Sequence, residues 1–510
     1  MKFMSLALTA PLLLAATTSV LAQAAPNTAN LGSGAWTAPR SDPSHAMLDR
    51  MAAIANPGNG VWTAEQVATM GRLRDAALKD TYAYDQLTYL TDSIGPRPSG
   101  SLQAQAAVER VAAQMRALGA VVTLEKTSVS HWVRGDETAA LTAWEGMTPG
   151  TTQKIVLTAL GNSVPTPAAG LTRQIVVVNS FAELKALPPG ALEGRIVLFN
   201  YPFDKELAAA GQGLNAYAQS AVYRVAGPSI AASLGAAAVL VRSVGSADFR
   251  LPHTGVTFFV EGVKPVPAAA VTSEDAELLS RLTRRGPVTL HLQLTPKTLQ
   301  PATSYNVIAD WKGSEHPEQI VLVSGHLDSW DLGTGAIDDG AGVVIAMQAI
   351  HMMKVLDIHP RRTIRLVAWM DEELGSPGAA TYLHDHAGDL ANHVAVMETD
   401  MGSGRPFGIT VSGVPALAAY FAPVARTLEP IGAASVNPGD EIGEDVGGIL
   451  ASGAPGWTPT QDLRFYFNYH HTAADTLDKV DPVDLAKNAT VAAVTAYALA
   501  DAAQPPPRSK

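Results

Sequence analysis

Residues 318–356 read "EQIVLVSGHLDSWDLGTGAIDDGAGVVIAMQAIHMMKVL", and this stretch decides the fold class of the chain. Its beginning, "EQIVLVSG", is a continuous apolar run, typical of a strand that is covered on both faces. Its end, "GAGVVIAMQAIHMMKVL", predicts an apolar helix. Between these two runs, Asp338 and Asp339 are adjacent although like charges repel. A strand, a crowded polar loop and a helix in this order indicate an α/β unit whose loop carries the chemistry.

The alternation of strands and helices continues toward the C-terminus, from about residue 303 onward. "TIRLVAWM" at 363–370 predicts the next buried strand, and "HVAVMETD" at 393–400 predicts a third. Strands that alternate with helices are typical of a mostly parallel sheet that is flanked by helices. The predicted fold class is therefore α/β, with a mostly parallel-centred mixed sheet.

Polar side chains follow each of these three predicted strands at the point where the strand ends. They are His326 and Asp328 after the first, Asp371, Glu372 and Glu373 after the second, and Glu398 and Asp400 at the end of the third. In open α/β sheets, ligands bind beyond the carboxyl ends of the strands. We therefore expect these side chains to meet at one edge of the sheet.

Several carboxylates can share a small volume if a divalent metal ion neutralises them. The chain contains no cysteine, so nitrogen and oxygen ligands remain, and these suit zinc better than manganese or cobalt. Asp328 lies two residues after His326, and in an extended segment the two side chains point the same way. The Asp328 carboxylate is thus expected to accept a hydrogen bond from the imidazole and to fix its tautomer.

The composition is that of a packed globular protein, with 47% hydrophobic and 16% charged residues. A chain of 510 residues is too long for one ordinary core, so two or more domains are expected. The formal net charge of −11 argues against binding of nucleic acid.

The N-terminus has the layout of a secretory signal peptide, which we predict at residues 1–24. Lys2 precedes a short apolar run, and "VLAQAA" at 20–25 offers small residues for cleavage. Polar residues cut the run short of the roughly 20 residues that span a membrane, so no membrane anchor is expected. The protein is predicted to be secreted or periplasmic, with a leader of little core at 25–60.

Helical spacing of apolar residues predicts helices over 64–76 and 102–118, and Gly119 is the expected C-cap of the second. Between 136 and 300, short β-branched runs separated by proline and glycine predict a separate strand-rich module. The other predicted parts are the catalytic domain in two pieces, with a short tail: residues 61–135, 301–504 and 505–510.

The chain resembles the M28 family of zinc peptidases, and most closely its carboxypeptidase Q branch. The likeness runs from about residue 80 to about residue 500. The matching segments are "GPRPSGS" at 95–101, "HWVRG" at 131–135, "LPHTG" at 251–255, "VLVSGHLDSWD" at 321–331, "GAIDDGAG" at 335–342, "EE" at 372–373 and "HHTAADT" at 470–476.

The resemblance implies a zinc exopeptidase (phosphorylase/hydrolase-like) fold, with a β-rich protease-associated domain inserted at 136–300. It implies two zinc ions per chain, one held by His326 and Asp400 and the other by Glu373 and His471. Asp338 would bridge the two ions, and Glu372 would be the general base. The implied substrates are dipeptides or short peptides cleaved by an exopeptidase, and the relatives of this branch work as homodimers.

Several assignments stay open at this point. His470 could replace His471 as the ligand, Asp339 is expected to orient its neighbours, and Asp371 either perturbs Glu372 or faces solvent. The other histidines carry no assigned chemistry: His384 and His386 are expected at the surface, and His131 and His253 in packing or in a substrate pocket.

Two rival functions share this architecture. A glutaminyl-cyclase-like acyltransferase would bind one metal ion per chain, and a non-catalytic receptor would have lost its ligands. Here all the ligand positions and the base are filled. The motifs of serine hydrolases (G-x-S-x-G) and of single-helix zinc proteases (H-E-x-x-H) are absent from the sequence.

Overall fold

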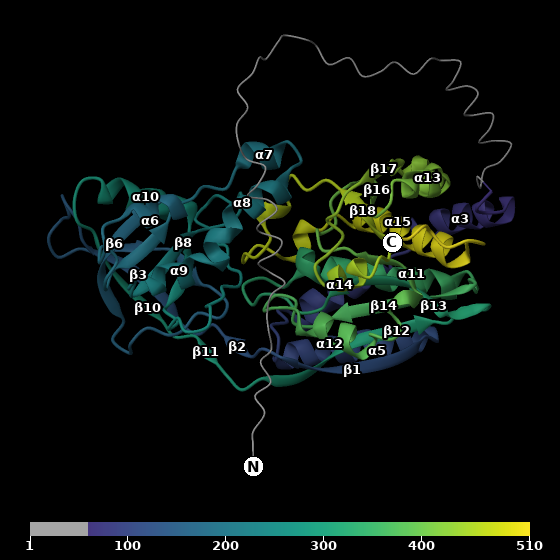
Figure 1. The fold of residues 1–510 in the computed structure, drawn as a ribbon, viewed down its shortest axis with the longest axis horizontal. Coiled ribbons are helices and arrows are strands. Elements are labelled where there is room, and N and C mark those ends of the chain that lie inside the picture. The colour runs from purple at the N-terminus through teal and green to yellow at the C-terminus, as the bar shows by residue number, and fades with distance from the viewer. Residues whose placement is uncertain (1–59, 510) are drawn as a thin grey trace, which may run out of the picture. The chain divides into compact units, whose positions relative to one another are not determined.

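The computed structural model describes residues 60–509 (Figure 1). The predicted signal peptide and nearly all of the predicted leader lie outside the described residues. Within the described range, no helix is both long enough and apolar enough to cross a membrane.

The first sheet has eight strands, and its centre is parallel. In spatial order the strands are β1 (Val121–Val129), β12 (Ala302–Trp311), β14 (Arg362–Trp369), β13 (His316–His326), β15 (His393–Glu398), β18 (Gly456–Gln461), β16 (Pro406–Ser412) and β17 (Ser435–Pro438). The four central strands β14, β13, β15 and β18 run parallel to one another. Strand β12 pairs antiparallel with β1 and β14, and β16 pairs antiparallel with β18. The predicted parallel-centred mixed sheet is confirmed.

Helices cover both faces of this sheet, which explains the continuous apolar run of β13. Val321 and Val323 belong to the core under one layer of helices, and Ile320 and Leu322 to the core under the other. The first layer comprises α3 (Ala64–Ala77), α4 (Tyr82–Thr88), α5 (Leu102–Leu118), α11 (Ala341–Val355), α13 (Ala416–Leu428) and α15 (Pro482–Asp501); the second comprises α12 (Pro377–Asp385) and α14 (Gly447–Ala451).

The predicted helices over 64–76 and 102–118 are confirmed as α3 and α5, and their caps explain their ends. Helix α5 begins where the Ser101 hydroxyl accepts a hydrogen bond from the Ala104 N–H. It ends at Gly119, whose φ of 97° lies in the left-handed region that favours glycine.

A second sheet, also of eight strands, is built from residues between 137 and 294. Its strands are β4 (Gln153–Ile155), β3 (Glu137–Ala143), β10 (Thr289–Leu294), β6 (Leu171–Val178), β7 (Ile196–Phe199), β8 (Ala238–Arg242), β9 (Ala268–Val271) and β5 (Leu157–Ala159). The chain enters this region at β2 (Trp132–Val133) and leaves it at β11 (Lys297–Thr298), and these two short strands pair with each other. We call residues 136–300 the insert.

The insert contains more helix than its sequence predicts. The sequence predicts a strand-rich module, and the structure adds five helices to it: α6 (Phe181–Ala186), α7 (Lys205–Ala209), α8 (Gly213–Val225), α9 (Gly227–Ser233) and α10 (Ser273–Thr283). The buried side of α8 carries Ala216, Ser220 and Tyr223, and its apolar residues are spaced much as in α5.

Candidate metal centre

His326 is the last residue of β13, and its imidazole is buried. Its Nδ1 donates a hydrogen bond to the main-chain oxygen of Asp328 at 3.1 Å. The proton on Nδ1 leaves the lone pair of Nε2 free to bind a metal ion. Nε2 lies 3.1 Å from Asp338 Oδ1 and 3.3 Å from Asp400 Oδ1.

The expected hydrogen bond from His326 to the Asp328 carboxylate is wrong, because that carboxylate lies 3.9 Å from Nδ1. The carboxylate instead accepts hydrogen bonds from the turn that follows β14. Asp328 Oδ1 receives the main-chain N–H groups of Asp371 and Glu372 at 2.7 and 3.1 Å, and Oδ2 receives that of Glu373 at 3.3 Å. Asp328 therefore fixes His326 with its main chain and positions the Glu372–Glu373 turn with its side chain.

Asp338 lies at the centre of the site and is buried. While its Oδ1 faces His326, its Oδ2 is 3.2 Å from Nε2 of His471. Asp339 points away from both histidine rings: its Oδ2 accepts the N–H of His326 at 3.0 Å and its Oδ1 that of Gly342 at 2.9 Å. The expectation that Asp339 orients its neighbours agrees with these contacts.

Arg97 of the "GPRPSGS" segment binds the loop between β13 and α11, which carries Asp328 and Asp338. The fully buried guanidinium donates from Nε to Leu327 O at 2.8 Å, from Nη1 to Thr334 O at 2.7 Å and from Nη2 to Gly335 O at 2.8 Å. These carbonyls flank Asp328 and Asp338, so one side chain fixes both ends of the loop.

Replacing Arg97 by methionine is expected to lower the free energy of unfolding by about 3 kcal/mol or more, since three buried carbonyls lose their charged donor. Urea denaturation of the two proteins measures the change. Arg281→Met, at an exposed position of α10, is the matched control and should stay near the parental value. Equal stability of both variants would contradict this role of Arg97.

The second half of the centre joins Glu373 to His471. Nε2 of His471 lies 3.1 Å from Glu373 Oε2, and its Nδ1 donates to the main-chain oxygen of Thr254 at 3.3 Å. The Thr254 N–H in turn donates to the His471 main-chain oxygen at 2.9 Å. His471 has a φ of 59°, so its backbone is strained and this pair of contacts with the insert holds it in place.

Two groups of ligand atoms therefore share Asp338. One comprises His326, Asp338 and Asp400, the other Asp338, Glu373 and His471, and within each group the ligand atoms lie within 4.8 Å of one another. Oε1 of Glu373 is buried without a hydrogen-bond partner among the described residues. Such a set of imidazole nitrogens and carboxylate oxygens fits zinc. The structure thus brings together all five side chains that the sequence predicts as metal ligands.

The electrostatics of these groups indicate a missing positive charge. Burial raises the pKa of Glu373 to about 7, although His471 opposes the shift. Burial alone lowers the pKa of His326, but the carboxylates of Asp400 and Asp338 outweigh it and raise that pKa well above its usual value. A divalent cation in this place relieves the repulsion among the carboxylates.

Glu372 lies beside both groups and is partly buried. Burial raises its pKa well above the usual value, with Glu444 and Glu373 adding to the shift and His326 opposing it. A carboxyl group beside these ligand atoms is placed to accept and return a proton.

The alternative that Asp371 faces solvent is wrong, since its side chain is fully buried. Its Oδ2 accepts the N–H of Ser130 at 2.6 Å, and its φ of 71° lies in the left-handed region. Burial, with the charge of Asp328, raises the pKa of Asp371 to about 7. Asp371 therefore ties the turn that carries Glu372 to the segment after β1.

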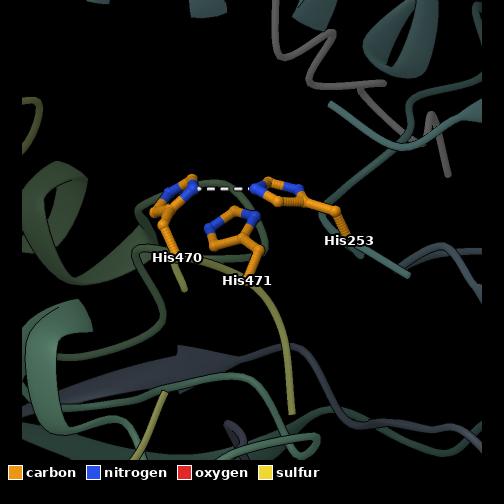
Figure 2. A group of neighbouring side chains, drawn as sticks. All are labelled: His253, His470 and His471. Carbon is orange, nitrogen blue, oxygen red and sulfur yellow. Dashed lines mark hydrogen bonds between the residues drawn. The ribbon is translucent and has the colours of Figure 1, made fainter. Parts of the chain in front are cut away.

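His470 is stacked on His471, with ring centroids 3.7 Å apart and an interplanar angle of 20°. Its Nδ1 lies 3.2 Å from Nε2 of His253, and Figure 2 draws this contact as a dashed line. His470 Nε2 lies 3.5 Å from Asp338 Oδ2, whereas His471 approaches both Asp338 and Glu373 more closely. This geometry favours His471 as the ligand.

His384 and His386 belong to neither group of ligand atoms. The side chain of His384 is 88% exposed, as expected. His386 is only partly exposed: it stacks on Tyr382 with centroids 4.1 Å apart and lies 3.1 Å from Glu125 Oε1. The surface prediction is therefore wrong for His386.

Three parts of the site carry no signal of their own in the sequence. The main-chain contacts of Thr254 come from a segment more than 200 residues before His471. The contact between His253 and His470 joins two segments far apart in the sequence, so local patterns do not predict it. Asp445 donates its N–H to Glu398 Oε2 at 2.9 Å, and burial raises the pKa of Asp445 to about 8. The "LPHTG" likeness at 251–255 marks the first two of these places, and nothing in the sequence marks the third.

The comparisons with known proteins agree with this geometry. A model of peptidase family M28 matches residues 306–496. Carboxypeptidase Q of Bos taurus is 38% identical over 430 residues, which cover 84% of this chain and 87% of the relative. The chain belongs to peptidase family M28. The family and the carboxypeptidase Q relative identify the chain as a metallo-exopeptidase.

Solved M28 structures extend the agreement to the fold. The peptidase M28 precursor of Shewanella amazonensis SB2B is similar with a TM-score of 0.80 and 36% identity, and the match covers 87% of this chain and 99% of that one. A zinc aminopeptidase of Bacillus subtilis, 20% identical with a TM-score of 0.58, shares the fold over 83% of this chain and 98% of its own. Membership of the M28 family and the donor set together imply zinc in this chain.

In this M28 peptidase, Asp328→Ala is expected to weaken metal binding about 10- to 100-fold, because the turn bearing Glu373 loses the acceptor of three N–H groups. The measurement is the metal content after equilibration with buffers of fixed free zinc concentration. Asp385→Ala, on the surface of α12, serves as the control and should match the parent. Parental affinity in the Asp328 variant would rule out this role.

Proposed function

We propose that the protein hydrolyses dipeptides or short peptides at one end, with two zinc ions per chain and Glu372 as general base. The observation that carries the proposal is the position of Asp338 between two groups of ligands, with one carboxylate oxygen facing His326 and the other facing His471. One carboxylate that faces both groups would let each group hold a metal ion of its own.

His326, Asp338, Asp400, Glu373 and His471 would hold the metal ions. Zinc bound there would lower the pKa of a water molecule and polarise the scissile carbonyl. The Glu372 carboxylate would accept a proton from the attacking water and return it to the leaving amine, a contribution of about 10²–10⁴-fold. Asp328 and Asp371 hold Glu372 in reach through the turn after β14. His326 and His471 keep their Nε2 atoms unprotonated by donating from Nδ1 to main-chain carbonyls.

The rival functions lack a comparable observation. A single-metal acyltransferase would not use the Glu373–His471 group, although Glu373 Oε2 and His471 Nε2 lie 3.1 Å apart. A non-catalytic receptor gives no reason for a buried Glu372 with a raised pKa beside the ligands. The hydrolase with two metal ions accounts for both.

Metal content decides between these alternatives. The purified protein is expected to contain two zinc ions per chain by plasma emission spectroscopy. Chelation should abolish hydrolysis of a dipeptide panel, and zinc should restore it. One zinc ion per chain together with cyclisation of N-terminal glutamine would favour the acyltransferase instead. Peptides with either end blocked, tested beside free dipeptides, show which terminus is recognised.

The proposal also covers where the enzyme acts and how its chains assemble. We place the active enzyme outside the cytoplasm, in the periplasm or the medium, and expect removal of residues 1–24 by a signal peptidase; N-terminal sequencing of the exported protein tests this. We also propose a homodimer, for which light scattering after size exclusion should give twice the mass of one chain.

A further inference from the structure

His253, from the insert, lies beside two histidines of the candidate metal centre (Figure 2). His253 is fully buried, and His470 and His471 are 7% and 8% exposed. One ring nitrogen of each residue lies within 4.8 Å of the others. The rings of His470 and His471 are stacked with an interplanar angle of 20°, so one metal ion cannot lie in the planes of both rings, as binding to their lone pairs requires. The group therefore needs another explanation, and its hydrogen bonds provide one.

The main-chain oxygen of Thr254, which also accepts from His471, fixes the proton of His253. A carbonyl oxygen can only accept, so the contact of 3.2 Å to His253 Nδ1 places the proton on that nitrogen. Arg224, which is itself buried, donates from Nη1 to the same oxygen at 3.3 Å and holds the carbonyl in place. Burial lowers the pKa of His253 well below its usual value, so the ring is neutral. The unprotonated nitrogen of His253 is therefore Nε2.

The lone pair on His253 Nε2 determines the tautomer of His470. His470 Nδ1 and His253 Nε2 are 3.2 Å apart, and a hydrogen bond between two ring nitrogens contains one proton. Because His253 Nε2 carries none, His470 donates this hydrogen bond from Nδ1. In the neutral ring, His470 Nε2 is then unprotonated, and this is the atom that lies 3.5 Å from Asp338 Oδ2.

The opposite tautomer of His470 would interfere with the shared carboxylate. A proton on Nε2 would face Asp338 Oδ2, the oxygen that also faces His471. A hydrogen bond to a carboxylate is among the stronger ones, and it would compete with a metal ion for the same lone pairs. With the proton on Nδ1 instead, Asp338 Oδ2 stays available to the group formed by Asp338, Glu373 and His471.

We propose that His253 is a positioning residue of the metal centre: it holds the proton of His470 on the nitrogen that does not approach Asp338, and so leaves the shared carboxylate free for the second metal ion. The inference rests on the proposed function and adds a role of the insert in metal affinity. His253 acts through His470, so both the tautomer of His470 and the affinity for zinc should depend on it.

The tautomer of His470 can be measured directly. In zinc-loaded protein labelled with nitrogen-15 at histidine, long-range proton–nitrogen correlation spectra distinguish the two tautomers, and the signal lost in His470→Phe is that of His470. We expect the proton on Nδ1 in the parent and on Nε2 in His253→Leu, whose side chain cannot accept. His253→Gln, whose amide oxygen can replace Nε2 as acceptor, should restore the parental tautomer. A proton on Nε2 of His470 in the parent overturns the inference.

Zinc affinity tests the consequence, through the zinc content in buffers of fixed free zinc concentration. His253→Leu should bind the second zinc ion about 10- to 100-fold more weakly than the parent. His470→Phe keeps the stacked ring and has no proton to donate, so it should bind zinc like the parent. In that background, His253→Leu should have no further effect. An equal loss from His253→Leu in both backgrounds overturns the inference, because a merely structural role of His253 does not depend on His470.

A control and a parallel assay complete the test. His384→Leu changes a histidine whose side chain is 88% exposed, and it should keep both the tautomer of His470 and the parental zinc affinity. Urea denaturation confirms that each variant is folded. A parent that binds two zinc ions without hydrolysing peptides defeats the proposed function alone. Parental zinc affinity in His253→Leu, with hydrolysis by the parent, defeats the role of His253 alone.

Discussion

Asp338→Ala is expected to lose both metal ions and all measurable hydrolysis. Its two oxygens lie 3.1 Å from His326 Nε2 and 3.2 Å from His471 Nε2, so the substitution removes one ligand from each group. Each remaining group keeps only one histidine and one carboxylate, below the three protein ligands usual for a catalytic zinc site. Plasma emission spectroscopy on dialysed protein and a dipeptide assay measure the two losses.

The Asp338 experiment needs a control variant that also loses one carboxylate but leaves the metal centre intact. Asp385→Ala provides it, since that carboxylate is on the surface and contacts only its neighbour His384. The control should retain two zinc ions and parental turnover. If Asp338→Ala kept both ions, the shared carboxylate would not be the bridge and the two-metal proposal would fail.

Glu372→Gln is expected to keep both metal ions and to lose about 10²–10⁴-fold in kcat, because the amide cannot accept the proton of the attacking water. The main-chain N–H of Glu372 still donates to Asp328, so the turn should keep its shape. Steady-state kinetics and metal analysis on the same preparation separate loss of the base from loss of the site.

A matched substitution on the surface checks the Glu372 result. Glu109→Gln alters an exposed residue of α5 and should leave kcat and metal content at parental values. Parental turnover in Glu372→Gln would remove this residue from the mechanism. Loss of metal in that variant would instead indicate a structural role.

The fold was predictable for elements that are buried on all sides and therefore consist almost entirely of apolar residues. Strand β13 buries every residue from Ile320 onward, and helix α11 buries every residue from Ala341 to Ile350. Such continuous apolar runs can be recognised from the sequence alone. Helix α8 was missed although its apolar residues are spaced much as in α5. The short β-branched runs around it, separated by proline and glycine, favour a strand-rich module.

The site was predictable as a set of residues but not as a set of contacts. The carboxyl ends of parallel strands brought His326 and the acidic residues after β14 and β15 together, as the register of these strands requires. The role of Asp328 was missed in detail because main-chain N–H groups, its true partners, leave no mark in a sequence. The support of His471 by Thr254 joins two distant segments, and no local spacing encodes it.

The contact between Thr254 and His471 limits how the insert can be replaced in evolution or by design. The ring of His471 is oriented by a carbonyl at residue 254, on a segment outside the sheet that carries the other ligands. Deleting the insert, or exchanging it for the equivalent region of a distant homologue, would therefore alter the reactive centre itself and not just access to it. Successful chimeras should be those that transfer the two segments together.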